Sequence, residues 1–394
     1  MRSVFQAGLV GLNFVARSIA APALIPPPPL EILGSLPFKW AAIGDSWASG
    51  VTYALNGATD YDNNKDGCMR IKHAYSAQMS NDDTWTTGKQ DMSFAACSGS
   101  KLVNMAVLNP QMPKTGDRPR IITMTAGGND AGFFNVVINC VYQQYLLINY
   151  GPAYPDPNGL CAIAIKNATD YIERAAGSNP DVLGLSEDLA ATLDDIFASN
   201  KIGDRESFRL YVTGYAHFFN AETDWCTAGS FGAFPLIGGQ PKLSKELRIA
   251  INGLVEKFNR VYEKTIADYP DKRVRYVEVT QGFEGNRFCE EGKSHRDQYY
   301  SDDVWLWNLP PPYETDQTAE MDHYYTTRSA ILDKEDPEDF SHVFDIFNDV
   351  KFESGVNGPG WMLRPFHPKE KGHAAIKDAI IAQARRDGVP GVKG

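Results

Sequence analysis

Residues 38–50 read FKWAAIGDSWASG. The run from 38 to 43 is short and mostly apolar, which is typical of a strand buried in a parallel sheet. Gly44, Asp45 and Ser46 follow it directly and indicate a turn from that strand into a helix. Loops at the carboxyl ends of such strands are where α/β proteins bind their ligands. The serine is therefore either an exposed, reactive hydroxyl or an ordinary helix cap.

Beyond this stretch, short apolar runs alternate with segments of helical periodicity. That alternation is typical of a parallel sheet with crossover helices. The expected further strands are 92–96, 121–125, 208–213 and 274–279, and the expected helices are 131–150, 186–197, 245–267 and 371–385. The predicted fold class is therefore α/β, with three α/β/α layers around a central, mostly parallel five-stranded sheet.

Composition limits the classes of function. Of the 394 residues 43% are hydrophobic, which is enough to build a sizeable core. The net charge is −11, and such an acidic chain lacks the clustered cations that bind nucleic-acid phosphates. Residues 131–155 are the best candidate for a membrane span, but five side-chain amides there argue against a lipid-facing helix. We therefore expect no nucleic-acid partner and no integral membrane span.

The N-terminal segment and the cysteines predict export. Residues 1–23 combine a basic start, an apolar block and small residues, as a signal peptide does, and residues 24–37 form a proline-rich spacer. The cysteines are even in number and none lies in a CxxC pair, which favours three disulfides over a zinc site. Of the 15 possible pairings we favour the sequential one, in which each disulfide holds a segment beside a motif described below: Cys68–Cys97, Cys140–Cys161 and Cys226–Cys289. A glycosylation sequon occurs at Asn167.

Three other loops carry residues suited to catalysis. Gly99 follows the second expected strand and has a backbone N–H to offer, and Asn129 follows the third, where its amide can donate to an oxygen that becomes negative. His367 precedes the last helix and is suited to general-base chemistry. Each residue alone is equally well explained as part of an ordinary turn or cap. Their combination with Ser46 is what indicates acyl transfer.

These four residues resemble, in order and in setting, the four motifs of the SGNH hydrolases, also called GDSL-type esterases and lipases. The match runs from about residue 38 to residue 386. Further segments, 68–75, 96–99 and 286–290, are similar to a secreted branch of actinobacterial esterases and their fungal relatives. The resemblance implies a flavodoxin-like fold in one domain over 38–386, a tail over 387–394, and three disulfides that brace the site.

The resemblance also implies roles. Ser46 is then the nucleophile, and the oxyanion hole consists of the backbone N–H groups of Ser46 and Gly99 with the Asn129 side chain. His367 is the general base. His373 is the alternative base, but the secreted branch favours the histidine that proline follows.

One departure from the family concerns the acid of the triad. The family places an aspartate three residues before the histidine, where this chain has Arg364, which cannot accept an imidazole N–H. Some members of the secreted branch orient this histidine with a backbone carbonyl, so the resemblance implies a Ser–His dyad here, with a carboxylate from residues 290–360 as the alternative. Asp45, Arg364 and His373 are expected to support the reacting groups rather than to react.

Two other segments have alternative explanations. Residues 290–360 lose all periodicity and are rich in acidic and aromatic side chains, which predicts an insertion that is either an ordered excursion or a lid. Residues 62–67 match the first half of a calcium loop, but its twelfth position holds His73 instead of an acid. We expect a polar surface turn there, and we expect neither a metal nor a cofactor.

The sequence thus predicts a secreted, extracellular and monomeric serine esterase or lipase. Its expected partners are carboxylic esters, such as lipids, cuticle-like polyesters or acylated carbohydrates. A polysaccharide O-deacetylase on the same residues is one alternative. A secreted binding protein that kept the fold without catalysis is another.

Overall fold

The computed structural model describes residues 37–51, 60–62, 66–143, 148–179, 182–202, 205–232, 241–308 and 365–394. The predicted signal peptide, residues 24–36 of the predicted spacer, Arg364 and residues 309–360 of the predicted insertion lie outside these ranges.

Five parallel strands form one central sheet in the order β2-β1-β3-β4-β5. Their bounds are Phe38–Gly44 for β1, Gln90–Phe94 for β2, Ile121–Thr125 for β3, Arg209–Thr213 for β4 and Val274–Val277 for β5. β1 lies between β2 and β3. The chain therefore passes from β1 to β2 on one side, and then from β2 to β3 on the other side of β1. The switch point of the sheet therefore lies at the carboxyl ends of β1 and β3, where ligand sites of such sheets occur.

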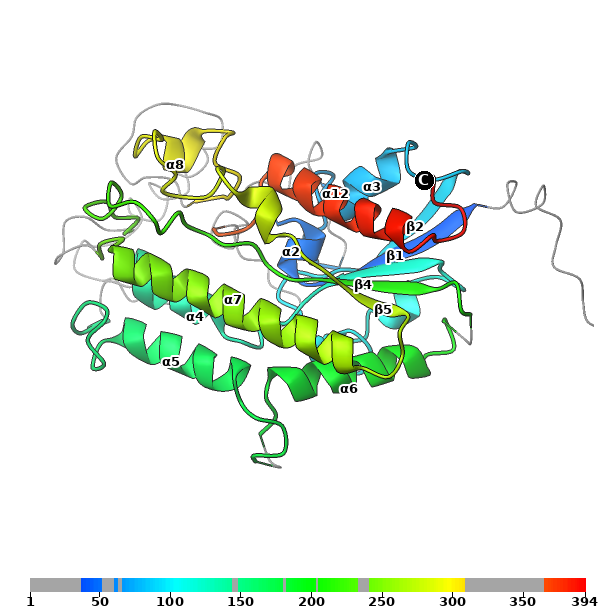
Figure 1. Ribbon diagram of the computed structural model, residues 1–394, viewed down its shortest axis with the longest axis horizontal. Helices are drawn as coiled ribbons and strands as arrows, with labels where there is room; N and C mark the ends of the chain where they lie inside the picture. Colours follow the sequence, from blue (N-terminus) through cyan, green and yellow to red (C-terminus); the bar gives the residue numbers. More distant parts are fainter. Residues whose placement is uncertain are drawn as a thin grey trace, which may run out of the picture.

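Helices cover both faces of this sheet (Figure 1). One face carries α3 (Tyr75–Asn81) and α12 (Glu370–Arg386), which pack against each other. The other carries α4 (Phe133–Val137), α5 (Leu160–Ile172), α6 (Leu185–Ala198) and α7 (Lys245–Asp268), with α7 in contact with both α5 and α6. The α/β/α fold class is thereby confirmed.

Short helices complete the loops. They are α2 (Ser46–Ser49), η1 (Leu102–Asn104), η2 (Met112–Lys114), η3 (Ile138–Tyr142, a π turn), η4 (Thr280–Phe283) and α8 (Asp297–Tyr300). Within the described part of the chain, no helix is both long and apolar enough to cross a membrane.

The longest helix, α7, lies almost where the sequence pattern predicts it, for clear physical reasons. Ser244 caps it by accepting a hydrogen bond from the Leu247 N–H at 3.2 Å. Its apolar side chains recur at helical spacing and form one buried stripe against the sheet: Leu247, Ile251, Leu254, Val255, Phe258, Tyr262 and Ile266. Burial of that stripe, more than intrinsic propensity, stabilises a helix of this kind.

Two predicted boundaries are wrong for physical reasons. The helix expected over 131–150 begins only at Phe133, because Gly132 adopts a left-handed conformation with φ of 67°. It passes through the π turn η3, and Gln143 ends it in a left-handed conformation with φ of 43°. Strand β2 begins and ends two residues before the predicted 92–96, because this edge strand is polar and half-exposed and so lacks an apolar signal.

The cysteines form three disulfides, Cys68–Cys97, Cys140–Cys161 and Cys226–Cys289, which confirms the sequential pairing. Residues 290–308 of the predicted insertion pack onto the body of the domain, and Val304 and Leu306 are fully buried there. Leu306 also pairs with Pro368 as an antiparallel bridge. The two chain ends that flank residues 309–364 therefore lie side by side.

The sheet depends on a very close approach at the end of β1. Gly44 has φ of 136°, and a Cβ atom there would lie 2.1 Å from the Thr125 carbonyl oxygen and 2.8 Å from the Ala48 Cβ. The next residue, Asp45, donates its N–H to that same carbonyl at 2.8 Å. Only glycine fits this position without separating the two strands.

We predict that Gly44→Ala lowers the free energy of unfolding by about 3 kcal/mol or more, through steric overlap and a strained φ. Chemical denaturation followed by circular dichroism measures this change. Gly253→Ala in α7 is the matched control, since nothing lies within 4 Å of its Cβ position, and it is expected to stabilise by roughly 0.5–1 kcal/mol. Equal stability of the two variants would contradict the prediction.

Candidate active site

The nucleophile candidate Ser46 is the first residue of α2, directly after β1. Asp45 caps this helix: one carboxylate oxygen accepts a hydrogen bond from the Trp47 N–H at 2.9 Å. The side chain of Trp47 is buried and fixes the turn to the core. This strand-to-helix turn holds Ser46 at the sheet's switch point with its side chain only partly buried.

His367 meets Ser46 from the far end of the chain. Its Nε2 lies 2.6 Å from the Ser46 Oγ, and its Nδ1 lies 3.1 Å from the Pro365 carbonyl oxygen. A carbonyl can only accept a hydrogen bond, so Nδ1 carries the proton in this contact. Nε2 is then the basic nitrogen, and it accepts the hydrogen bond of the serine hydroxyl.

Backbone pairing fixes the loop that carries His367. The Trp307 N–H donates to the His367 carbonyl at 2.9 Å, and the Phe366 N–H donates to the Trp307 carbonyl at 2.8 Å. The Phe366 ring is buried among other aromatic rings, including Phe218 and Phe219 at centroid distances of 5.1 and 5.6 Å. The histidine is thus held by a neighbouring strand segment and by an apolar cluster.

The structure places His373 away from the serine hydroxyl. It is a fully buried residue of α12 whose ring lies 6.4 Å from that of Tyr75, and neither ring nitrogen has a hydrogen-bond partner among the described residues. Burial lowers its pKa from 6.5 to about 3, so the ring is neutral near pH 7. Its ring packs between α12 and α3.

The oxyanion-hole candidates come from two further strand ends. Gly99 has φ of 79° in the loop after β2, and Asn129 lies in the loop after β3. Asn129 donates one amide hydrogen to the Ser100 carbonyl at 2.8 Å, which leaves the second amide hydrogen for another acceptor. Ser46, Gly99, Asn129 and His367 all line one pocket.

Sequence reasoning missed Gln111, which connects two of these loops. Its side-chain oxygen accepts from the Gly44 N–H at 2.7 Å, and its amide donates to the Gly44 carbonyl at 2.9 Å and to the Ser100 Oγ at 3.0 Å. Tyr215, just after β4, was also missed, although it is buried beside Asp45. Gln111 lies outside every strand end, whereas the place of Tyr215 at the end of a predicted strand was a usable signal.

The pocket continues away from Ser46 as an apolar space. Its lining reaches across α4, η3 and α7 to α5: Phe133, Phe134, Val137, Ile138, Tyr142, Leu254, Val255, Phe258, Ala168 and Ile172. Trp47 and Phe218 line it nearer to the serine. The arrangement combines a polar reacting end with a long apolar wall.

The other predicted site residues have structural surroundings. Asp62 and Asp66 of the calcium-like segment both pair with Arg70, at 2.6 and 2.7 Å, while residues 63–65 lie outside the described part. Among the described residues, no group of His, Cys, Asp and Glu side chains could hold a metal ion. Asn167 is exposed on α5, so its sequon stays a prediction.

Two curated lipases are similar to this chain in sequence. No protein-family model matches the chain. A lipase of Streptomyces rimosus is 27% identical over 283 residues, which cover 69% of this chain and 85% of that lipase. Lipase 1 of Streptomyces coelicolor is 24% identical over 251 residues, which cover 64% of this chain and 72% of that protein.

Two solved structures share the fold. An extracellular lipase of Streptomyces rimosus matches with a TM-score of 0.52 and 19% identity, covering 88% of this chain and 98% of the other. A phospholipase A1 of Streptomyces albidoflavus matches with a TM-score of 0.53 and 20% identity, covering 89% and 99%. These similarities support the resemblance to the SGNH hydrolases that the four short motifs carry.

The buried His373 makes the stability of this protein sensitive to acid. Its pKa is lowered in the folded state, so below its unfolded pKa of about 6.5 the unfolded chain binds the extra proton and gains stability. The free energy of unfolding of the wild type should therefore fall by up to about 1.4 kcal/mol per pH unit between about pH 6 and pH 4 through this group. We predict that His373→Leu lacks this part of the loss. Urea denaturation of both proteins measures it, with pH 8 as the reference where both states are neutral. A wild-type-to-variant difference that is independent of pH would contradict the prediction.

Proposed function

We propose that this protein is a serine ester hydrolase of the SGNH type, secreted and active as a monomer, with Ser46 as nucleophile and His367 as general base. The observation that carries the proposal is the 2.6 Å contact between the Ser46 Oγ and the His367 Nε2, with Nδ1 directed to the Pro365 carbonyl. The disulfides favour an oxidising compartment.

In the first step, the Ser46 oxygen attacks the ester carbonyl carbon while His367 takes the hydroxyl proton. The carbonyl oxygen becomes negative and is stabilised by the Ser46 and Gly99 N–H groups and by the free amide hydrogen of Asn129. When this intermediate collapses, His367 returns the proton to the departing alcohol and an acyl-enzyme forms. Water then attacks that acyl group by the same route, and the acid is released.

The Pro365 carbonyl takes the place of the usual aspartate in this proposal. A carbonyl selects the correct tautomer and orientation of the imidazole, as a carboxylate does. It has no full negative charge, so it stabilises the protonated imidazole less. The dyad therefore depends on the rigid backbone pairing of the His367 loop to keep its geometry.

The apolar pocket favours a long acyl chain as the acid part of the substrate. Each methylene group transferred from water to such a wall contributes about 0.8 kcal/mol, whereas an acetyl group would leave most of the pocket empty. The relatives named lipase and phospholipase A1 agree with a lipid-like ester. An O-deacetylase on the same residues and a binding protein without catalysis are the alternatives.

We predict that Ser46→Ala and His367→Ala each lower kcat for p-nitrophenyl butyrate by about 1,000-fold or more, because each removes a group that acts in bond formation. His373→Leu is the matched control and is expected to keep most activity, since His373 does not reach the serine. Stopped-assay kinetics on folded protein, checked by circular dichroism, measures this. Wild-type rates in Ser46→Ala would support a non-catalytic binding protein, and retained activity in His367→Ala would refute its role as base.

We predict that Ala168→Phe, which adds a large ring to the pocket lining on α5, lowers kcat/KM for palmitate esters by about 10-fold or more and leaves acetate esters nearly unchanged. Ile163→Phe is the matched control, because Ile163 is 42% exposed on the same helix. A series of p-nitrophenyl esters from acetate to palmitate measures both. Wild-type preference for acetate would favour the deacetylase, and equal effects of both variants would remove α5 from the acyl pocket.

A further inference from the structure

A buried chain of hydrogen bonds joins the nucleophile turn to the loop that carries Asn129. On one side, a carboxylate oxygen of Asp45 accepts from the Trp47 N–H at 2.9 Å. The other carboxylate oxygen accepts from the Tyr215 hydroxyl, and that hydroxyl oxygen accepts from the Gly128 N–H at 3.0 Å. The residue after Asp45 is Ser46, and the residue after Gly128 is Asn129.

The direction of these bonds follows from the number of protons. A phenol has one hydrogen, and the Tyr215 oxygen already accepts the Gly128 N–H, so its own hydrogen goes to Asp45. Burial raises the pKa of Tyr215 well above its usual 10, which keeps the phenol protonated at working pH. Burial also raises the pKa of Asp45 to about 7 against the hydrogen bonds that lower it.

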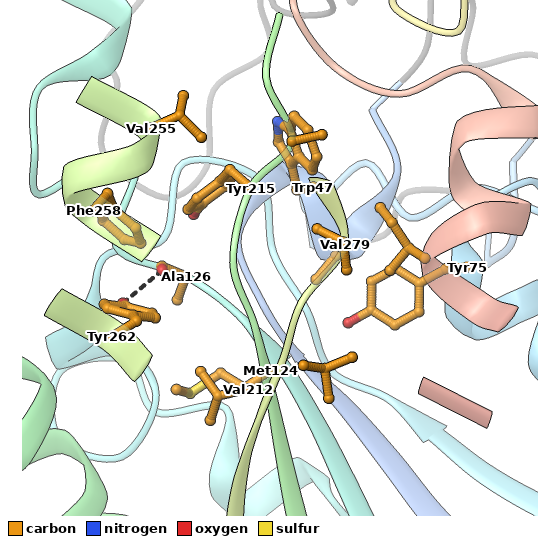
Figure 2. Close-up of a cluster of buried hydrophobic side chains, with 14 of the residues drawn as sticks. Trp47, Tyr75, Met124, Ala126, Val212, Tyr215, Val255, Phe258, Tyr262 and Val279 are labelled. Carbon is orange, nitrogen blue, oxygen red and sulfur yellow. Dashed lines mark hydrogen bonds between the residues drawn. The ribbon is translucent and has the colours of Figure 1, made fainter. Parts of the chain in front are cut away.

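Tyr215 is itself fixed from several sides. Figure 2 shows its ring between Trp47 and Phe258, and both ring pairs have centroid distances of 5.2 Å in edge-on contact. Its backbone N–H donates to the Asn259 side-chain oxygen at 3.0 Å, and its carbonyl accepts from the Asn259 amide at 2.8 Å. A Cβ on Gly128 would lie 3.1 Å from the Tyr215 oxygen, so the loop approaches the phenol as closely as glycine allows.

We propose that Tyr215 and Asp45 are positioning residues that set the place of the Asn129 amide relative to Ser46. This inference rests on the proposed function: it adds Tyr215 to it and gives a specific task to Asp45, which the sequence predicts only to support the reacting groups. Without the phenol, the Gly128 N–H and the Asp45 carboxylate each lose a buried partner, and the loop after β3 is free to shift. A shifted Asn129 would stabilise the oxyanion less, and the oxyanion exists only in the transition state and the tetrahedral intermediate.

The test is Tyr215→Phe, which removes one oxygen and keeps the ring contacts. We expect kcat to fall by about 10- to 100-fold while KM changes by less than about 2-fold, because ground-state binding is untouched. An alkyl trifluoromethyl ketone, whose hemiketal with a serine hydroxyl carries an oxyanion, should bind more weakly by the same factor. The matched control is Tyr211→Phe. Tyr211 belongs to β4, and its hydroxyl also donates to an aspartate, Asp387 at the end of α12, at 3.1 Å. Tyr211→Phe should leave kcat and inhibition at wild-type values.

A double-mutant cycle separates positioning from a general loss of structure. Asp45→Asn keeps an acceptor for the Trp47 N–H but removes the carboxylate that faces the phenol. In the double variant, the fold-loss of kcat should be clearly smaller than the product of the losses in Asp45→Asn and Tyr215→Phe, because both substitutions act through one hydrogen bond.

Three results would overturn the inference: a kcat of Tyr215→Phe within about 2-fold of wild type, an equal loss in Tyr211→Phe, or full multiplicativity in the cycle. Ser46→Ala shows which proposal has failed. If Ser46→Ala is inactive and Tyr215→Phe is fully active, only the positioning role is wrong. If Ser46→Ala keeps wild-type turnover, the proposed function itself is wrong.

Discussion

The contact between the end of β1 and the end of β3 is the constraint on which the site depends. The Asp45 N–H donates to the Thr125 carbonyl at 2.8 Å across a glycine that leaves no space for a side chain. This contact aligns the two loops that follow, one with Ser46 and the other with Asn129. Gln111 then connects Gly44 to the loop after β2, so hydrogen bonds fix three loops relative to one another.

The fourth loop, which carries His367, is held next to these three by other contacts. His367 is separated from Ser46 by 321 positions, and its loop is held by backbone pairing with Trp307 and by the buried ring of Phe366. Trp307 and Phe366 lie side by side, since the Phe366 N–H donates to the Trp307 carbonyl. The position of the imidazole is therefore set by the body of the domain that the structure describes.

The polar and apolar parts of the pocket have separate physical tasks. In the proposed reaction, the polar end, with Ser46, His367 and Asn129, stabilises the negative charge that develops on the ester group. The wall formed by α4, α5 and α7 would select the acyl part through the apolar area removed from water, an effect that is non-directional and tolerant of sequence change. The motif therefore indicates the chemistry, whereas the helices around it decide the substrate.

The sequence by itself determined the α/β class, the five strands and the four residues that meet at the site, and it carried the resemblance to the SGNH hydrolases. It did so because apolar periodicity reports burial and because strand-end loops of a parallel sheet must converge. The resemblance to the secreted branch also implied the carbonyl-oriented histidine. Only the tertiary structure decided that Gln111 and Tyr215 connect the loops, where the helix after β3 stops, and which helices form the acyl wall. These features depend on contacts between residues far apart in the chain, and no local pattern records which distant partner a buried polar group or an apolar face will meet.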